Sequence, residues 1–92
     1  MKVVWTDGAA EDLKLIVEYI SKDSEDAGRR IAKTIYERAM SLATFPHKGH
    51  RRRSEDGFEL VCRPWPYVII YEILDEAVFI EGIIHTSRDR AL

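Results

Sequence analysis

Basic side chains are concentrated in one short stretch of this sequence. The stretch His47-Lys48-Gly49-His50-Arg51-Arg52-Arg53 lies in a chain whose formal net charge is only −2. Clustered lysines and arginines can neutralise the phosphates of a nucleic acid, although such clusters also occur as solvated loops. Six of the 14 basic residues would converge if this stretch lay beside two later arginines. The candidate target- or nucleic-acid-binding residues are therefore Lys48, Arg51, Arg52, Arg53 and Arg88, with Arg63 as the sixth cation.

Histidine and cysteine side chains are the other candidates for chemistry. His47, His50, Cys62 and His85 could suggest a metal ion, but their spacing matches no zinc pattern, so we predict no metal and no cofactor. The single cysteine cannot form an internal disulfide and is most simply a small buried hydrophobe. Together with an N-terminus that lacks a signal segment, this favours a cytoplasmic location.

Length and composition favour one folded domain. With 92 residues, 46% of them hydrophobic and 33% charged, the chain can form one core, so we expect a single domain over residues 1–92. The longest apolar runs, such as Tyr67–Tyr71, are far shorter than the roughly 20 residues that a membrane helix needs. We therefore expect no membrane partner. The near-neutral charge also argues against nucleic-acid binding by charge alone.

The first half of the chain predicts a strand and two amphipathic helices. Residues 2–6 are strand formers, and Thr6-Asp7 offers a helix N-cap. Apolar residues then recur at helical spacing, first from Ala9 to Ile20 and then from Ala27 to Phe45. Between these stretches, Asp23-Ser24 breaks the pattern and can cap the second helix. Pro46 ends the second helix. The two helices form a hairpin whose apolar stripes must pack against the second half of the chain.

The second half predicts a loop followed by three strands. Residues 46–57 form an exposed loop, because they contain two glycines, a proline and many charges. Phe58–Arg63, Tyr67–Leu74 and Ala77–His85 are predicted strands, and Thr86–Leu92 is a polar tail. The order β-α-α-β-β-β predicts an α+β fold, in which the helical hairpin packs on one face of a mainly antiparallel four-stranded sheet.

The register of the last two strands decides which side chains remain available. A two-residue turn at Asp75-Glu76 puts Tyr71 opposite Ile80 on the helix-covered face. The other face would then collect two acids and a histidine (Glu72, Glu81 and His85) with an apolar patch for a protein partner, made of Val68, Ile70, Phe79 and Ile83. A three-residue loop with a bulge would swap the faces, and Asp-Glu lacks the glycine or asparagine that favours a two-residue turn.

Four segments, taken in order, carry a resemblance over nearly the whole chain. They are Val4-Trp5-Thr6 with Ala9–Leu13, Phe45–Arg51, Pro66–Tyr71 and Ile84–Asp89. With these segments and this secondary structure, the sequence resembles the RelE/ParE superfamily, the toxins of bacterial type II toxin–antitoxin pairs. The resemblance implies a partner, the cognate antitoxin, whose disordered C-terminal segment folds on binding.

The two branches of that superfamily imply different targets. RelE-like members cleave mRNA on the ribosome with an arginine in a central-strand Y-R-x-x-Y motif and a histidine or tyrosine near the C-terminus. Here Val68 stands at the arginine position, His85 matches the histidine, and Arg63 or an arginine of the basic stretch would have to substitute. On that alternative reading, His85 and Arg63 are the catalytic residues.

ParE-like members poison DNA gyrase and are not known for catalysis. The missing arginine, the near-neutral charge and the His-x-x-Arg-Asp ending favour this branch. The resemblance therefore implies a gyrase-binding toxin, neutralised by a cognate antitoxin on Val68, Ile70, Phe79 and Ile83. A homologue that has lost both activities and serves only in the complex with its antitoxin is a third reading.

Overall fold

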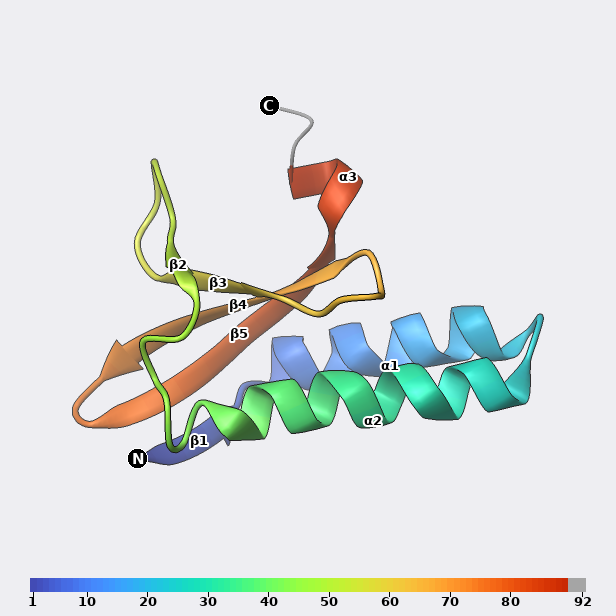
Figure 1. The fold of residues 1–92 in the computed structure, drawn as a ribbon, viewed down its shortest axis with the longest axis horizontal. Coiled ribbons are helices and arrows are strands. Elements are labelled where there is room, and N and C mark those ends of the chain that lie inside the picture. The colour runs from blue at the N-terminus through green and yellow to red at the C-terminus, as the bar shows by residue number, and fades with distance from the viewer. Residues whose placement is uncertain (90–92) are drawn as a thin grey trace.

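Two helices lie side by side on one side of a mixed sheet (Figure 1). The computed structural model describes the backbone of residues 1–89 and the side chains of residues 1–87. The elements in chain order are β1 (Lys2–Trp5), α1 (Asp7–Ser21), α2 (Glu25–Ser41), β2 (His50–Arg51), β3 (Phe58–Val61), β4 (Tyr67–Leu74), β5 (Ala77–His85) and α3 (Thr86–Asp89). The β2–β3 loop and α3 extend on the side of the sheet opposite to α1 and α2 (Figure 1).

Both helices of the hairpin begin at the caps that the sequence predicts. The Thr6 side chain accepts a hydrogen bond from the Ala9 amide, and its hydroxyl donates to the Ile80 carbonyl of β5 at 2.7 Å. Ser24 caps α2 through the Ala27 amide. Side-chain oxygens at these positions satisfy amides that lack partners within the helix. Thr6 therefore also fastens the start of α1 to the sheet.

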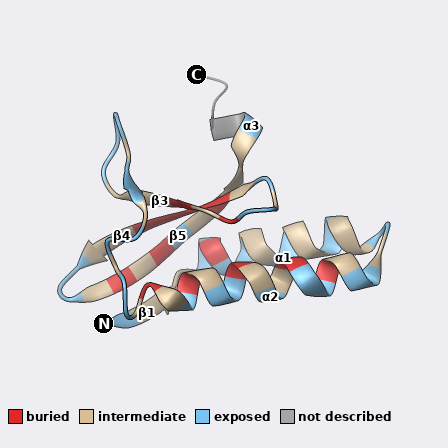
Figure 2. Cartoon of the chain, in the orientation of Figure 1, coloured by how far each residue is buried: buried red, intermediate tan, exposed pale blue. Residues whose placement is uncertain are grey.

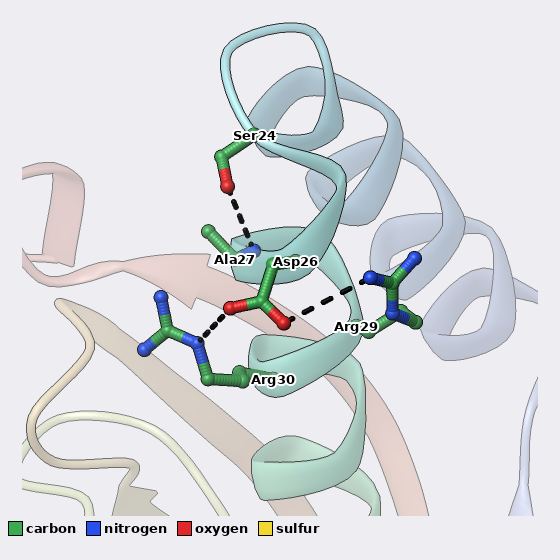
Figure 3. A network of polar contacts seen from close by, with 5 residues as sticks. All are labelled: Ser24, Asp26, Ala27, Arg29 and Arg30. Atoms are coloured by element: carbon green, nitrogen blue, oxygen red, sulfur yellow. Dashed lines mark hydrogen bonds and ion pairs between the residues drawn. The ribbon is translucent and has the colours of Figure 1, made fainter.

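An exposed network of charges lies on the first turns of α2. Asp26 accepts a 3.0 Å hydrogen bond from Arg30 and forms a 3.8 Å ion pair with Arg29 (Figure 3). A carboxylate near a helix N-terminus interacts favourably with the helix dipole, and pairs at i+3 and i+4 lie on one face. The network therefore supports the helix start locally, without contributing to the core.

The sheet has the strand order β1-β5-β4-β3-β2, with β1 parallel to β5 and the other pairs antiparallel. The turn between β4 and β5 has two residues, as predicted: Asp75 and Glu76 both adopt positive φ, 49° and 59°, so that Leu74 pairs with Ala77. Two successive left-handed residues give the turn whose twist matches an antiparallel hairpin. The predicted pairing of Tyr71 with Ile80 is confirmed.

The predicted α+β fold is confirmed, with local differences, one of which is that β3 ends at Val61 and not at the predicted Arg63. Within the predicted loop, His50–Arg51 pairs with β3, so the sheet has five strands instead of four. The start of the predicted tail, Thr86–Asp89, forms the short helix α3, while residues 90–92 lie outside the described part. Phe45, the expected last residue of the second apolar stripe, is 61% exposed because α2 ends at Ser41.

The core lies between the helical hairpin and the strands. Its fully buried side chains include Ile31 and Ile35 of α2, Ile69 and Tyr71 of β4, and Val78 and Ile80 of β5. The buried positions line the helix faces that point toward the sheet, whereas the β2–β3 loop is largely exposed (Figure 2). The apolar stripes predicted from the sequence therefore do cover one face of the sheet.

Candidate functional site

A bulge in β5 changes which residues share a face with which. The pairing runs from Leu74–Ala77 to Tyr71–Ile80, then shifts, so that Ile70 pairs with Gly82 and Glu81 has no partner in β4. An unpaired residue reverses the alternation of side chains beyond it. From Gly82 onward, each residue of β5 lies on the face opposite to the predicted one.

Two predicted residues are displaced by this shift. Ile83 pairs with Ile69 and is 5% exposed in the core, so its predicted place on the outer face, the face away from α1 and α2, is wrong. His85 pairs with Tyr67, and their rings meet edge to face at 5.3 Å. Its place on the outer face is also wrong, since Tyr67 shares the parity of Ile69 and Tyr71.

The bulge lies where the neighbour of β5 changes. Up to Ile80, the edge of β5 is paired with β1; beyond it, the Ile83 amide donates a 3.0 Å hydrogen bond to the Asp12 carboxylate of α1. A buried amide without such a partner is unfavourable. A side chain placed 71 residues away in the sequence therefore stabilises the shifted register.

The outer face carries a cluster of three acids and one arginine. Glu72 and Glu81 share a hydrogen bond, and Arg52 forms a 3.8 Å ion pair with Glu59. The hydrogen bond with Glu72, partial burial and the charge of Glu72 raise the pKa of Glu81 from 4.5 to about 7, while Arg52 opposes this rise. Two neighbouring carboxyls that cannot both ionise freely can hold and release a proton near neutral pH. The sequence placed Glu72 and Glu81 on this face but gave no sign that they meet.

The three consecutive arginines have different surroundings. The side chain of Arg52 is 16% exposed and pairs with Glu55 at 3.2 Å as well as with Glu59, so its charge is compensated within the chain. The Arg51 guanidinium lies 5.3 Å from the centre of the Phe58 ring. Arg51, Arg53 and Lys48 are exposed. Lys48, Arg51 and Arg53 are therefore presented to solvent, whereas Arg52 forms ion pairs with Glu55 and with Glu59 of the outer face.

The segment that carries Lys48 is fastened to the sheet by Tyr71. The Gly49 amide donates to the Tyr71 hydroxyl, which in turn donates to the Pro46 carbonyl, both at 2.9 Å. A Cβ at Gly49 would lie 2.6 Å from the Glu59 carbonyl oxygen and 2.7 Å from the Tyr71 hydroxyl. Only glycine fits between these groups, which explains physically why this segment contains a glycine after Pro46.

The two residues of the predicted nuclease site lie at one end of the sheet, near the start of β4. Arg63 is exposed, two residues beyond the end of β3, and its carbonyl accepts a 2.9 Å hydrogen bond from Arg38 of α2. His85 ends β5, and its Nδ1 accepts a 3.1 Å hydrogen bond from the Ser87 amide, so the neutral ring carries its proton on Nε2. Arg88 belongs to α3, but its side chain lies outside the described part.

The expected convergence of six cations is wrong for Arg63. Arg51 pairs with Phe58 at the start of β3, whereas Arg63 follows the end of that strand (Figure 1). The basic stretch and Arg63 therefore lie at opposite ends of β3. The cysteine between them, Cys62, is fully buried, and burial raises the pKa of its thiol to about 11 although Arg38 opposes the rise, which fits a small hydrophobe.

The predicted apolar patch is mostly closed. Val68 and Ile70 lie on the outer face, as predicted, but they are only 3% and 7% exposed. Phe79, opposite Glu72, is half-buried. With Ile83 in the core, the patch offers much less open apolar surface than the sequence suggested.

An apolar hollow lies on the helical hairpin. It measures about 430 Å³ and is lined by Trp5, Ala10, Leu13, Lys14, Val17, Glu18, Ala32 and Tyr36. The Trp5 and Tyr36 rings stack at 6.3 Å, and the buried Nε1 of Trp5 has no hydrogen-bond partner. Of the exposed large apolar side chains, Leu15, Tyr19, Tyr36 and Met40 belong to the two helices.

None of the helices in the described part of the chain combines the length and apolar character needed to cross a membrane. Within the same residues, no group of three or more histidine, cysteine or acidic side chains is placed to hold a metal ion.

Known proteins with similar sequences are toxins. Residues 3–90 match the family described as ParE toxin of the type II toxin–antitoxin system parDE. Toxin RelE2 of Caulobacter vibrioides is 41% identical over 87 residues, which cover 95% of this chain and 97% of that protein. A putative toxin of Sinorhizobium fredii, Y4kP, is 36% identical over 78% of this chain and 75% of its own length.

Solved structures agree with this assignment. The fold matches a chain of the chromosomal ParDE system of Pseudomonas aeruginosa with a TM-score of 0.79 at 24% identity, over 92% of this chain and 95% of the other. It also matches a chain of the RelBE2 toxin–antitoxin complex of Mycobacterium tuberculosis, with a TM-score of 0.64 and 28% identity over 91% and 95%. The chain belongs to the ParE toxin family, within the RelE/ParE superfamily of type II toxin–antitoxin systems.

Proposed function

We propose that this toxin acts as a ParE-like poison of DNA gyrase and is neutralised by a cognate antitoxin. The observation that carries the proposal is the composition of the outer face around β4. Val68, at the position of the nuclease arginine, is an apolar side chain with 3% exposure, and no residue of β4 is a cation. Cleavage of RNA needs cationic groups at the phosphate in the transition state. The match to the ParE family supports the same branch.

The placement of the other expected nuclease residues gives further support. His85 packs on Tyr67, on the face opposite to Glu72, and its Nδ1 is engaged by Ser87. The charge of Arg52, the least exposed of the three arginines, is compensated by Glu55 and Glu59. RNA cleavage requires that an acid, a base and a cation all reach one phosphate. His85 and Arg52 are not arranged in this way.

The test is to give purified toxin to gyrase, plasmid DNA and ATP, and to measure cleaved DNA trapped on the enzyme. We expect cleavage complexes to accumulate with toxin dose, and His85→Ala to retain this activity. In cells, arrest by the toxin alone should induce the DNA-damage response. Rapid loss of translated mRNA while DNA stays intact, abolished by His85→Ala, would establish the nuclease instead.

One observation favours the second candidate, an mRNA endoribonuclease of the RelE kind that works on the ribosome. Glu81 lies on the outer face beside Glu72, and the hydrogen bond with Glu72 raises the pKa of Glu81 to about 7, a value suited to a general base. Under this candidate, Glu81→Gln would abolish RNA cleavage on translating ribosomes. Under the gyrase proposal, Glu81→Gln leaves toxicity intact.

We place the antitoxin on the hollow of the helical hairpin. Apolar burial drives most protein association, and Tyr36, 52% exposed beside that hollow, has more surface to lose than Val68 or Ile70. Tyr36→Glu should weaken antitoxin binding, whereas Phe79→Glu, which tests the patch of Val68, Ile70, Phe79 and Ile83, should leave it nearly unchanged. A pull-down with co-expressed antitoxin measures both effects. If Phe79→Glu weakens binding more than Tyr36→Glu does, the antitoxin contacts the outer face instead.

A further inference from the structure

The hydroxyl of Tyr71 is a buried polar group that the core does not need. Tyr71 is fully buried in the core cluster, where a phenylalanine would fill nearly the same volume. A buried hydroxyl is tolerated only when it is hydrogen-bonded. Both of its hydrogen bonds go to the segment before β2, one to Pro46 and one to Gly49. The hydroxyl therefore serves the 46–51 segment rather than the packing of the sheet.

The Tyr71 ring continues outward into a column of aromatic contacts. Phe58 stacks on Tyr71 with centroids 5.3 Å apart and an angle of 16° between the planes. The Arg51 guanidinium lies 5.3 Å from the centre of the Phe58 ring, and His47 meets that ring edge-on at 5.8 Å. A cation held against an aromatic face loses much of its rotational freedom. The column thus links the core to the exposed side chain of Arg51.

The same segment fixes the backbone of Lys48. Its amide donates to the Phe45 carbonyl at 3.1 Å, and Gly49, next in the chain, is enclosed by Tyr71 and Glu59. Lys48 and Arg51 are both exposed, whereas Arg52 is paired within the chain. Two solvent-facing cations are therefore mounted on backbone that the core holds in place.

We propose that Tyr71 and Phe58 are positioning residues, which present Lys48 and Arg51 as a fixed pair of cations to phosphate groups of the nucleic acid held by the toxin's target. The inference rests on the proposed function and on the prediction that the basic stretch binds the target. Holding cations in their bound arrangement lowers the entropy lost on binding. DNA on gyrase and mRNA on the ribosome both offer such phosphates, so the inference does not depend on which one is the target.

The first test is Tyr71→Phe in the full chain, with Tyr19→Phe on the exposed face of α1 as the matched control. Tyr71→Phe should speed hydrogen exchange at the Gly49 amide and weaken binding of a short DNA duplex at low salt, roughly threefold to tenfold for the lost hydrogen bonds. Tyr19→Phe should change neither quantity. Phe58→Leu keeps the Tyr71 hydroxyl, so it should weaken duplex binding while the Gly49 amide stays protected.

A double-mutant cycle with Arg51→Ala separates positioning from general stability. Arg51→Ala should lower the slope of log affinity against log salt by about one, as expected for one lost phosphate contact. In that background, Tyr71→Phe should have a clearly smaller effect on affinity than in the wild type. If Tyr71 had only a structural role, Tyr71→Phe would lower the melting temperature, and it would weaken duplex binding as much in the Arg51→Ala background as in the wild type. This outcome would overturn the inference.

Two further outcomes decide between this inference and the proposed function. Wild-type toxin that binds the duplex without salt dependence would overturn the inference, whatever gyrase shows. If gyrase is not poisoned but the Tyr71→Phe and Arg51→Ala effects are coupled in duplex binding, the inference stands and only the gyrase assignment falls. An assay of RNA cleavage on translating ribosomes then shows whether the phosphates belong to RNA.

Discussion

The two faces of the sheet differ in the burial and the charge of their side chains. On the face covered by α1 and α2, the central side chains Ile69, Tyr71 and Ile80 have no exposed surface, and packing explains their size and apolar character. On the outer face, Glu81 is hydrogen-bonded to Glu72 near the paired Arg52, amid apolar side chains. Like charges held together oppose folding and are not needed to build the sheet. Packing therefore accounts for the covered face, whereas it does not account for the neighbouring carboxyls of the outer face.

The largest effect on the free energy of unfolding should come from shortening a side chain on the covered face. Ile69→Ala removes a fully buried side chain and should lower the free energy of unfolding by about 2–5 kcal/mol. Ile84→Ala, on the outer face opposite Val68 and only half-buried, should lower it by much less. Urea denaturation of both variants measures the difference, and equal losses would remove the contrast between the faces.

The next effect concerns the contact that sets which residues reach each face. Asp12→Ala leaves the Ile83 amide without its acceptor and should destabilise the fold by about 1–3 kcal/mol. Asp12→Asn keeps a carbonyl oxygen and should recover part of the loss, while Glu11→Ala, on the exposed side of α1, serves as the control. If Asp12→Ala is as stable as the control, the register beyond the bulge does not depend on α1.

A smaller effect, and one that depends on pH, is expected on the outer face. Because the pKa of Glu81 is raised from 4.5 to about 7, the folded chain binds a proton more tightly than the unfolded chain between these values. The resulting stabilisation is complete below about pH 4.5 and is lost as pH rises through about 7. Glu81→Gln should flatten this part of the pH profile.

Melting temperatures of the wild type and Glu81→Gln from pH 4 to 9 test this expectation. Carboxyl NMR shifts of Glu72 and Glu81 would show whether the pair titrates near neutral pH. A wild-type profile that runs parallel to that of Glu81→Gln would mean that the two carboxyls do not interact in solution. The outer face would then lose the feature that distinguishes it most clearly from the covered face.

The smallest effect is expected away from both faces, at the start of α2. Asp26→Ala removes two ion pairs whose side chains are 63–72% exposed (Figure 3). Exposed pairs are screened by water and salt, so the loss should stay below about 1 kcal/mol and shrink further at high salt. Thermal melts at low and high salt measure it. A loss as large as that of Asp12→Ala would show that local charges matter as much as contacts with the sheet.

Much of the fold could be read from local patterns. The caps at Thr6 and Ser24, the apolar stripes of the two helices and the limits of Tyr67–Leu74 and Ala77–His85 all agree with the structure. Each depends on neighbours within a few residues, where spacing and residue type act directly. The turn at Asp75-Glu76 formed with two residues despite its side chains, because pairing along β4 and β5 compensates for the positive φ values.

The candidate site was less predictable, because it depends on contacts between distant residues. The convergence of the basic stretch with Arg63 failed because antiparallel pairing carries them to opposite ends of β3. The patch of Val68, Ile70, Phe79 and Ile83 lost one member to the core. The meeting of Glu72 with Glu81 and the anchoring of Gly49 by Tyr71 gave no local signal, since hydrogen bonds across the sheet leave no trace in spacing.

By itself, the sequence determined the main elements and their order, because propensity and periodicity are properties of neighbouring residues, and its motifs carried the resemblance to the toxin superfamily. Only the tertiary structure decided which face His85 and Ile83 occupy. One unpaired residue in β5 reverses the alternation beyond it, and that residue lies where β1 ends and Asp12 of α1 takes over the strand edge. Side-chain direction there is settled by a contact across 71 positions, which local pattern cannot encode.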